Sequence, residues 1–174
     1  MSRKVDHNIF LIGFMGAGKS TIARVLQKEL DMELIEMDER IVEEQGMSIN
    51  DIFEQKGENG FRDIESQLVI DIGKSSNSIV SCGGCVVIRP QNVENMKKSG
   101  KIVFLTARPE TILERVKNGK DRPLLNGHMN VEYISEMMEK RRVFYEGAAD
   151  FRVSTDDKTV GEICTEIIQI LTRE

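Results

Sequence analysis

One stretch near the amino terminus constrains the fold of this chain more than any other. It reads Gly13-Phe14-Met15-Gly16-Ala17-Gly18-Lys19-Ser20-Thr21 and fits the phosphate-binding pattern G-x-x-x-x-G-K-[ST]. The apolar run 9–12 before it is typical of a buried strand, and Ile22, Leu26 and Leu30 after it recur at helical spacing. This stretch, called the P-loop below, is therefore predicted to join the end of a strand to the start of a helix.

The residue types of the P-loop explain how such a loop binds a nucleotide. Its glycines allow backbone angles that are closed to other residues and let the main chain approach an anion. The amides then point at phosphate oxygens, helped by the helix dipole, while Lys19 reaches the β- and γ-phosphates and the Ser20 hydroxyl ligates Mg2+. The predicted cofactors are ATP and Mg2+, held by Gly16, Ala17, Gly18, Lys19, Ser20 and Thr21. A chance glycine-rich turn is the alternative, which the flanking strand and helix disfavour.

Beyond the P-loop, predicted strands and helices alternate to the end of the chain. This order predicts an α/β fold, a mainly parallel sheet covered by helices on both faces, in a single domain of 174 residues. The insert 38–72, which is helical and interrupted at Gly46 and Gly57, is predicted to form a substrate-binding wall. The polar loop at about 117–130 is predicted to form a lid. The predicted strands are 9–12, 33–37, 78–82, 101–106 and 151–155, and the other predicted helices include 19–30, 90–98, 131–147 and 159–171.

Charge and composition narrow the partners of the chain. A formal net charge of −5 disfavours nucleic acid and anionic membranes, so an anionic substrate needs a local cluster of Arg and Lys. No apolar run approaches the roughly 20 residues of a membrane span, and residues 1–8 lack the apolar core of a signal peptide. We therefore expect a cytoplasmic monomer that binds small molecules.

Two carboxylates at the end of the second predicted strand are candidates for catalysis. Phosphoryl transfer needs positioning, Mg2+ and positive charge, together with a carboxylate that orients an acceptor hydroxyl. On an extended strand Glu36 and Asp38 share a face, beside the P-loop strand if the two strands are neighbours. We interpret one carboxylate as facing the metal and the other as facing the acceptor. The alternative is that Asp38 caps the next helix and Glu36 is an exposed strand residue.

Three arginines are candidate anion-binding groups, each with an exposed surface charge as the alternative. Arg62 and Arg141 lie on different predicted helices. If they converge, they form a fork for a carboxylate, because guanidinium groups bind carboxylates in bidentate fashion. Arg122 lies in a loop flanked by glycines and would act as an arginine finger on a lid. Gly83-Gly84 after a strand offers free amides to a substrate, or is a plain turn.

The spacing Cys82-x-x-Cys85 can indicate a metal or redox site. A closed zinc site needs four ligands, and the sequence holds only one further cysteine and two histidines, with no second paired motif. We therefore interpret these cysteines as incidental to function. Ser20 and, through its water shell, Glu36 remain the predicted metal-binding residues.

Taken together, these motifs resemble the shikimate kinase family over nearly the whole chain. No single later motif is specific for the family, but the order in which the motifs follow a P-loop is specific for it. The motifs are Gly16-Ala17-Gly18-Lys19-Ser20-Thr21, the acidic pair ending at Asp38, Ser48-Ile49-Asn50-Asp51-Ile52-Phe53, Gly60-Phe61-Arg62-Asp63-Ile64-Glu65, Gly83-Gly84, Arg122-Pro123-Leu124-Leu125, and Arg141 with Tyr145.

The resemblance implies transfer of the γ-phosphoryl group of ATP to the 3-hydroxyl of shikimate, on a five-stranded parallel sheet. By similarity, Asp38 binds the shikimate hydroxyls and helps to activate one of them. Similarity further implies that the substrate carboxylate is held by Arg62 and Arg141 with Gly83 and Gly84 nearby, that Lys19 and Arg122 neutralise the phosphoryl group, that Ser20 ligates Mg2+, and that Arg115 and Lys158 lie near the adenine.

Three positions depart from the family pattern. Glu36 stands where the family usually has Asp, Cys85 replaces a third glycine, and Val143 stands where the family often has Pro. A positive φ at Cys85 would be strained. The nearest alternative function is a kinase of another small hydroxy acid such as gluconate, and the alternative outside enzymes is a nucleotide-binding sensor. A degenerate sensor should have lost Lys19 or Asp38, and both are present.

Overall fold

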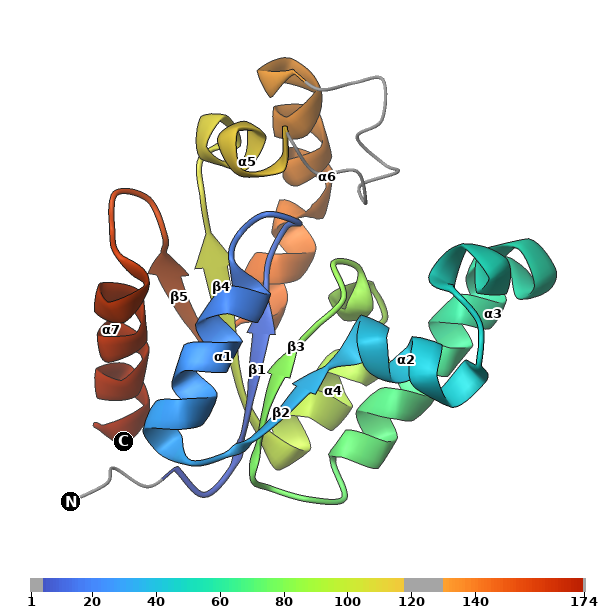
Figure 1. Cartoon of the computed structure of the whole chain (residues 1–174), viewed down its shortest axis with the longest axis horizontal. Coiled ribbons are helices and arrows are strands. Elements are labelled where there is room, and N and C mark those ends of the chain that lie inside the picture. Colours follow the sequence, from blue (N-terminus) through green and yellow to red (C-terminus); the bar gives the residue numbers. More distant parts are fainter. Residues whose placement is uncertain (1–4, 118–129, 174) are drawn as a thin grey trace.

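The fold is built on one parallel sheet of five strands (Figure 1). The computed structural model describes residues 5–117 and 130–173. All strand pairings are parallel, so the carboxyl ends of the strands meet at one edge of the sheet. The predicted α/β fold with a five-stranded parallel sheet is confirmed. The strands are β1 (Asn8–Ile12), β2 (Glu33–Glu36), β3 (Ser78–Ser81), β4 (Gly100–Thr106) and β5 (Phe151–Ser154), in the order β2-β3-β1-β4-β5.

Helices follow the strands in the predicted alternation and cover both faces of the sheet. A 3-10 turn, η1 (Val86–Ile88), joins β3 to the next helix and is an element that the sequence pattern does not predict. Within residues 5–117 and 130–173, no helix has the length and apolar character needed to cross a bilayer. The helices are α1 (Lys19–Leu30), α2 (Met37–Gln45), α3 (Ile49–Ile72), α4 (Pro90–Ser99), α5 (Pro109–Val116), α6 (Val131–Ala148) and α7 (Val160–Thr172).

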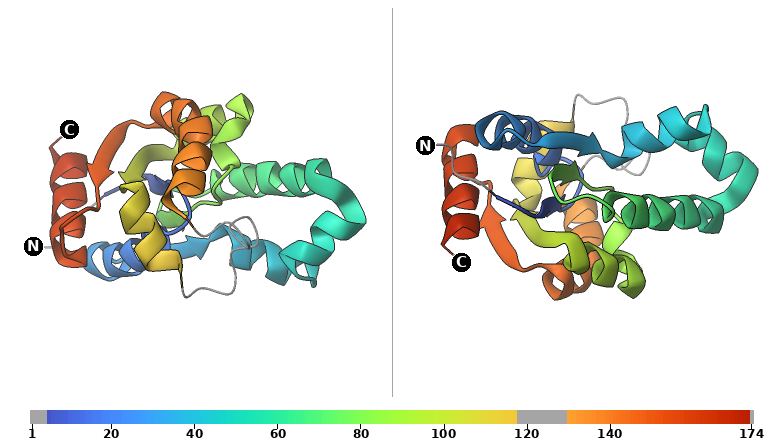
Figure 2. Two further views of the ribbon diagram at one scale, coloured as in Figure 1. Left: turned by 90° about the horizontal axis from the view of Figure 1, so that it is seen from above. Right: turned by 90° about the horizontal axis from the view of Figure 1, so that it is seen from below.

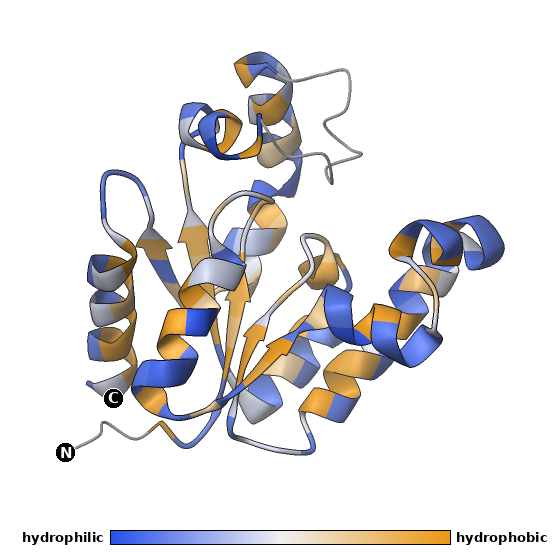
Figure 3. Ribbon diagram, in the orientation of Figure 1, coloured by the Kyte–Doolittle hydropathy of each residue, from blue (hydrophilic) through white to orange (hydrophobic). Residues whose placement is uncertain are grey.

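The central strand β1 shows how one sheet supports two cores. All of its residues are buried. Ile9 and Leu11 belong to an apolar cluster with side chains of α1 and α7, whereas Phe10 and Ile12 belong to a second cluster with side chains of α3 and α4. Because successive strand side chains point to opposite faces, the two clusters lie on opposite sides of the sheet. Figure 3 shows apolar residues concentrated on the strands and on the helix faces that cover them.

One prediction about the second strand is wrong, and a condition attached to it is not met. β2 ends at Glu36 and Met37 already begins α2, so Glu36 and Asp38 do not lie on one extended strand. β3 also separates β2 from β1, so the acidic pair does not lie beside the P-loop strand. Acidic residues in a first helical turn favour the helix, because they face the positive end of its dipole. Strand order, in contrast, depends on packing between distant segments and has no local signal.

The insert formed by α2 and α3 projects from the β2 side of the sheet (Figures 1 and 2). The Ser48 hydroxyl accepts the Asp51 amide at 3.1 Å, which is the cap expected of that motif. Gly57, with φ of 71° and ψ of 177°, interrupts α3 at the predicted position. After this break, the buried side chains of Phe61 and Leu68 anchor the insert in the same core as Phe10 of β1.

Candidate active site

The P-loop turns from β1 into α1 with its backbone open to an anion. Gly16 and Gly18 have φ angles of 82° and 98°, which L side chains rarely adopt. A Cβ on Gly16 would also lie 2.7 Å from Val116 Cγ1, so a side chain there would collide with α5. Gly18 is the N-cap of α1 and has no side chain to satisfy the first amides of the helix. These amides and the positive end of the helix dipole therefore form an anion site.

Three oxygen-bearing side chains lie beside the start of α1. Ser20 Oγ is 3.4 Å from Ser81 Oγ, and Ser81 is the register partner of Glu36 in the β2–β3 pair. Glu36 Oε1 is buried, has no hydrogen-bond partner among the described residues, and lies 3.5 Å from Arg24 Nη2. Mg2+ prefers oxygen ligands and keeps several waters in nucleotide sites. This donor set fits a magnesium ion on Ser20 with Glu36 facing its water shell.

Asp38 lies in the first turn of α2, next to the loop that follows β3. A Cβ built on Gly83 would lie 3.4 Å from Asp38 Oδ1 and 2.7 Å from Glu65 Oε2. Two carboxylates therefore approach the backbone at Gly83 together, and a larger residue would displace them. The segment Cys82-Gly83-Gly84-Cys85 is called the glycine loop below. This geometry puts the predicted acceptor carboxylate at the predicted substrate loop.

Arg62 reaches the glycine loop through Glu65. Arg62 Nη1 donates to Glu65 Oε1 at 2.7 Å, and the Glu65 side chain is 1% exposed. Burial raises the pKa of Glu65 more than the hydrogen bond and charge of Arg62 lower it, and the Asp38 charge raises it further. The Arg62 guanidinium also lies over the Phe61 ring, 5.2 Å from its centroid. The orientation of Arg62 is thus held by a buried carboxylate on one side and by a ring on the other.

Arg141 approaches the glycine loop from α6. Its Nη1 would lie 3.5 Å from a Cβ on Gly84, and its guanidinium lies over the Phe14 ring of the P-loop, 5.4 Å from the centroid. One turn later, Tyr145 Oη donates to Gly84 O at 2.6 Å, and its ring packs on Phe104 with centroids 5.1 Å apart. Burial raises the pKa of Tyr145 to about 12, so its hydroxyl remains a donor at neutral pH. Both candidate carboxylate-binding arginines are therefore associated with one loop.

The cysteines that end the glycine loop differ in their surroundings. Cys82 is buried, and burial raises the pKa of its thiol to about 12 although the Lys19 charge lowers it. Cys85 is half-buried and has a φ of −118°. The residue that replaces a glycine therefore adopts an ordinary backbone conformation, and the strain considered for a positive φ does not arise. Both thiols are free.

Arg115 joins the P-loop to the turn after β5. Its Nη1 donates to Gly16 O at 3.0 Å and to Thr155 Oγ1 at 3.1 Å, and its Nη2 donates to Thr155 O at 3.2 Å. Lys158, the other residue predicted near the adenine, donates to Glu166 Oε2 at 2.8 Å. The structure thus ties Arg115 to the P-loop and Lys158 to α7. Arg122 and residues 118–129 of the predicted lid lie outside the described residues.

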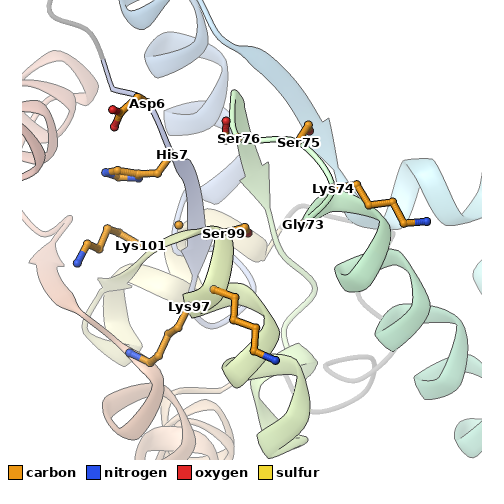
Figure 4. Close-up of a pocket in the computed structure, with 11 residues that line it drawn as sticks. Asp6, His7, Gly73, Lys74, Ser75, Ser76, Lys97, Ser99 and Lys101 are labelled. Atoms are coloured by element: carbon orange, nitrogen blue, oxygen red, sulfur yellow. The ribbon is translucent and has the colours of Figure 1, made fainter.

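Among the cavities formed by the described residues, one lies at each end of the strands. A cavity of ≈ 480 Å³ lies at the amino ends, away from the P-loop, where residues such as Lys74, Lys97, Ser75 and Ser99 surround it (Figure 4). Lys74 follows the carboxyl end of α3 and Lys97 lies in the last turn of α4, where the helix dipole favours cations. A second cavity of ≈ 440 Å³ lies behind the P-loop, bounded by Phe14 and by side chains of β4, α5 and α6. Of these two, the second cavity adjoins the candidate site.

Three residues at this site were not identified from the sequence as functional. Glu65 follows Arg62 by three positions and Tyr145 follows Arg141 by four, and both spacings put the pair on one helix face. That spacing is the signal by which they could have been found. Ser81 has no such signal, because its contact with Ser20 depends on β3 lying next to β1.

Comparison with known proteins agrees with this geometry. The shikimate kinase family model matches residues 15–172. A shikimate kinase of Dehalococcoides mccartyi is 42% identical over 164 residues, covering 94% of this chain and 93% of that protein. The structure of the Acinetobacter baumannii shikimate kinase in complex with shikimate matches with a TM-score of 0.88 at 29% identity, covering 96% of this chain and 93% of that chain. A Sinorhizobium meliloti gluconokinase shares only the fold, with a TM-score of 0.65 at 18% identity over 98% of this chain and 94% of its own. On the breadth of these matches, the chain belongs to the shikimate kinase family.

Proposed function

We propose that this protein transfers the γ-phosphoryl group of ATP to the 3-hydroxyl of shikimate. The observation that carries the proposal is the convergence of Asp38, Arg62 and Arg141 on the glycine loop, beside the P-loop. A compact substrate with one carboxylate and vicinal hydroxyls engages both arginines and the aspartate at once. The relative whose structure is a complex with shikimate supports the same acceptor.

The P-loop holds the donor nucleotide. Its amides and the amino end of α1 bind phosphate oxygens. Lys19 Nζ donates to Gly13 O at 2.5 Å, and by turning from that carbonyl it reaches the β- and γ-phosphates. Ser20, with Glu36 behind the water shell, would hold Mg2+, which when bound offsets the charge of the phosphate oxygens.

Asp38 acts on the acceptor hydroxyl. Its carboxylate accepts a hydrogen bond from the hydroxyl and orients the oxygen in line with the γ-phosphorus. It takes the proton as the new oxygen–phosphorus bond forms and as the bond between that phosphorus and the bridging oxygen of ADP breaks. Asp38 Oδ1 would lie 3.4 Å from a Cβ on Gly83, so this carboxylate stands at the glycine loop where the acceptor hydroxyl is proposed to bind.

Three further cationic side chains complete the proposed active site. Arg122 supplies positive charge to the phosphoryl group in flight, as the family pattern implies for this position. Arg115 forms one wall of the adenine site, because its bonds to Gly16 and Thr155 hold its guanidinium between the P-loop and the turn after β5. Lys158 belongs to the same site, on that turn.

An assay that couples ADP release to a second enzyme tests the proposal. With Mg-ATP, shikimate should give turnover and gluconate should not. Asp38→Asn should lower kcat by about 10²-fold to 10⁴-fold, the contribution of a general base, while the Kd for ADP changes little. Absence of shikimate-dependent ADP release would overturn the proposed function. Wild-type turnover in the Asp38→Asn variant would remove Asp38 from the acceptor role.

A further inference from the structure

We infer that Phe14 is a positioning residue that couples nucleotide binding at the P-loop to the arginine that binds the acceptor carboxylate. The inference rests on the proposed function, because it names how the two substrate sites of that reaction communicate. Phe14 occupies an undefined position of the phosphate-binding pattern, so phosphate binding itself does not require a ring there. Its side chain is nevertheless 2% exposed and reaches α6.

One guanidinium links the two loops of the site. Arg141 lies over the Phe14 ring at 5.4 Å from the centroid, and its Nη1 would lie 3.5 Å from a Cβ on Gly84. A cation over the face of a ring is attracted by the ring quadrupole, and the attraction is stronger where water is excluded. The ring of Phe14 therefore sets the direction in which Arg141 points at the glycine loop.

The backbone around Phe14 is bonded to the lysine and to an amide of the phosphate-binding loop. Lys19 Nζ donates to the carbonyl of Gly13, the residue before Phe14, and the Ala17 amide donates to the carbonyl of Phe14 at 3.0 Å. When Lys19 turns to the phosphates, it leaves the Gly13 carbonyl. Phe14 also lines the cavity of ≈ 440 Å³ behind the P-loop, so the ring has space in which to shift. The position of the ring thus depends on whether the P-loop holds a nucleotide.

On the other side of the Arg141 contact, α6 and the glycine loop are held rigidly together. Tyr145 Oη holds the Gly84 carbonyl at 2.6 Å, and its ring packs on Phe104. Because α6 and the glycine loop are fixed to each other, a shift of the Phe14 ring changes the aim of Arg141 rather than moving α6. Coupling between two binding sites is reciprocal, so each substrate should tighten the binding of the other by the same factor.

Isothermal titration of shikimate into the protein, with and without ADP and Mg2+, tests this coupling. The unsubstituted protein should bind shikimate about fivefold or more tightly when ADP is present, within the usual range of coupling between sites. In Phe14→Leu this gain should fall below about twofold, while the Kd for ADP alone stays within about twofold of the original, because the phosphate ligands are intact. Phe14→Tyr keeps the ring and should keep the gain.

The outcomes separate this inference from the proposed function. A gain that persists in Phe14→Leu, or one that is lost equally in Phe14→Tyr, would overturn the role of the ring. A gain that is absent from the unsubstituted protein would overturn the coupling itself, although shikimate still binds and is phosphorylated. Failure of the unsubstituted protein to bind shikimate under any condition would instead remove the proposed function, and this inference with it.

Discussion

At the scale of single residues, the acceptor site depends on which partners of Arg62 are buried. Glu65 accepts from Arg62 at 2.7 Å and its side chain is 1% exposed, whereas Glu58 lies 3.6 Å from Arg62 and is 70% exposed. A buried, charge-assisted hydrogen bond fixes an arginine in one direction, but an exposed ion pair contributes little. The two glutamates therefore form a matched pair for substitution.

Glu65→Gln should raise the KM for shikimate by about tenfold, the effect of losing one hydrogen bond between charged groups, because Arg62 is no longer held toward the substrate carboxylate. The effect on kcat should be smaller, since Arg62 binds a part of the substrate that does not react. Steady-state kinetics with varied shikimate measures both constants. Glu58→Gln should leave KM within about twofold. Equal effects of the two substitutions would contradict the assignment of Glu65 as the residue that orients Arg62.

At the scale of elements, the features that could be predicted from the sequence are those that depend on the residue pattern of a single segment. Apolar spacing and glycine positions predict the strands, the long helices and the break at Gly57, because each depends on neighbours in the chain. Strand order, the neighbourhood of Ser20 and Ser81, and the short turn η1 depend on distant packing and could not be predicted. Asp38, Arg62 and Arg141 were selected by residue type, and their convergence depends on tertiary structure; their roles remain predictions.

Asp156, in the turn after β5, binds the amino end of α5, the helix that carries Arg115. Its carboxylate accepts from the Arg108 amide at 3.1 Å and from Thr111 Oγ1 at 2.7 Å, at the amino end of α5. Burial pushes the pKa of Asp156 upward, but these hydrogen bonds and the Arg108 charge outweigh it, so the pKa is lowered from 3.8. The ionised form of Asp156 therefore stabilises the fold, and with it the helix that carries Arg115.

Asp156→Asn should lower the free energy of unfolding by about 1 kcal/mol at neutral pH, because the charge at the helix terminus is lost. A lowered carboxyl pKa contributes stability that is present above its ordinary value and is lost as pH falls through the lowered value. The difference between the two proteins should therefore shrink below about pH 3.8. Urea unfolding across this range measures it. Asp157→Asn removes only a contact of an 82% exposed carboxylate and should change stability by less than about 0.5 kcal/mol; a larger change there would contradict the role of Asp156.

At the scale of the whole molecule, the carboxyl ends and the amino ends of the strands have different roles. The carboxyl ends of the strands lead to the P-loop, Glu36, the glycine loop and Thr155, so the chemistry gathers there. The amino ends are held together by buried polar contacts. Asn8 is fully buried; its Nδ2 donates to Ser75 O at 2.8 Å and to Ser99 Oγ at 3.2 Å, and its Oδ1 accepts the Ser78 amide at 2.9 Å. One side chain thus joins β1, β3 and the ends of α3 and α4.

Asn8→Ala should therefore separate stability from activity. The substitution leaves several buried polar groups without partners, and it should lower the free energy of unfolding by about 2–4 kcal/mol. The KM for shikimate and the Kd for ADP should stay within about twofold, measured well below the melting temperature, because the far edge of the sheet keeps its geometry. Lys98→Ala changes a 67% exposed side chain that lines the cavity at the amino ends of the strands, and it should alter stability by less than about 0.5 kcal/mol. A large loss of shikimate binding in a folded Asn8→Ala protein would show that the amino ends of the strands and the candidate site are not independent.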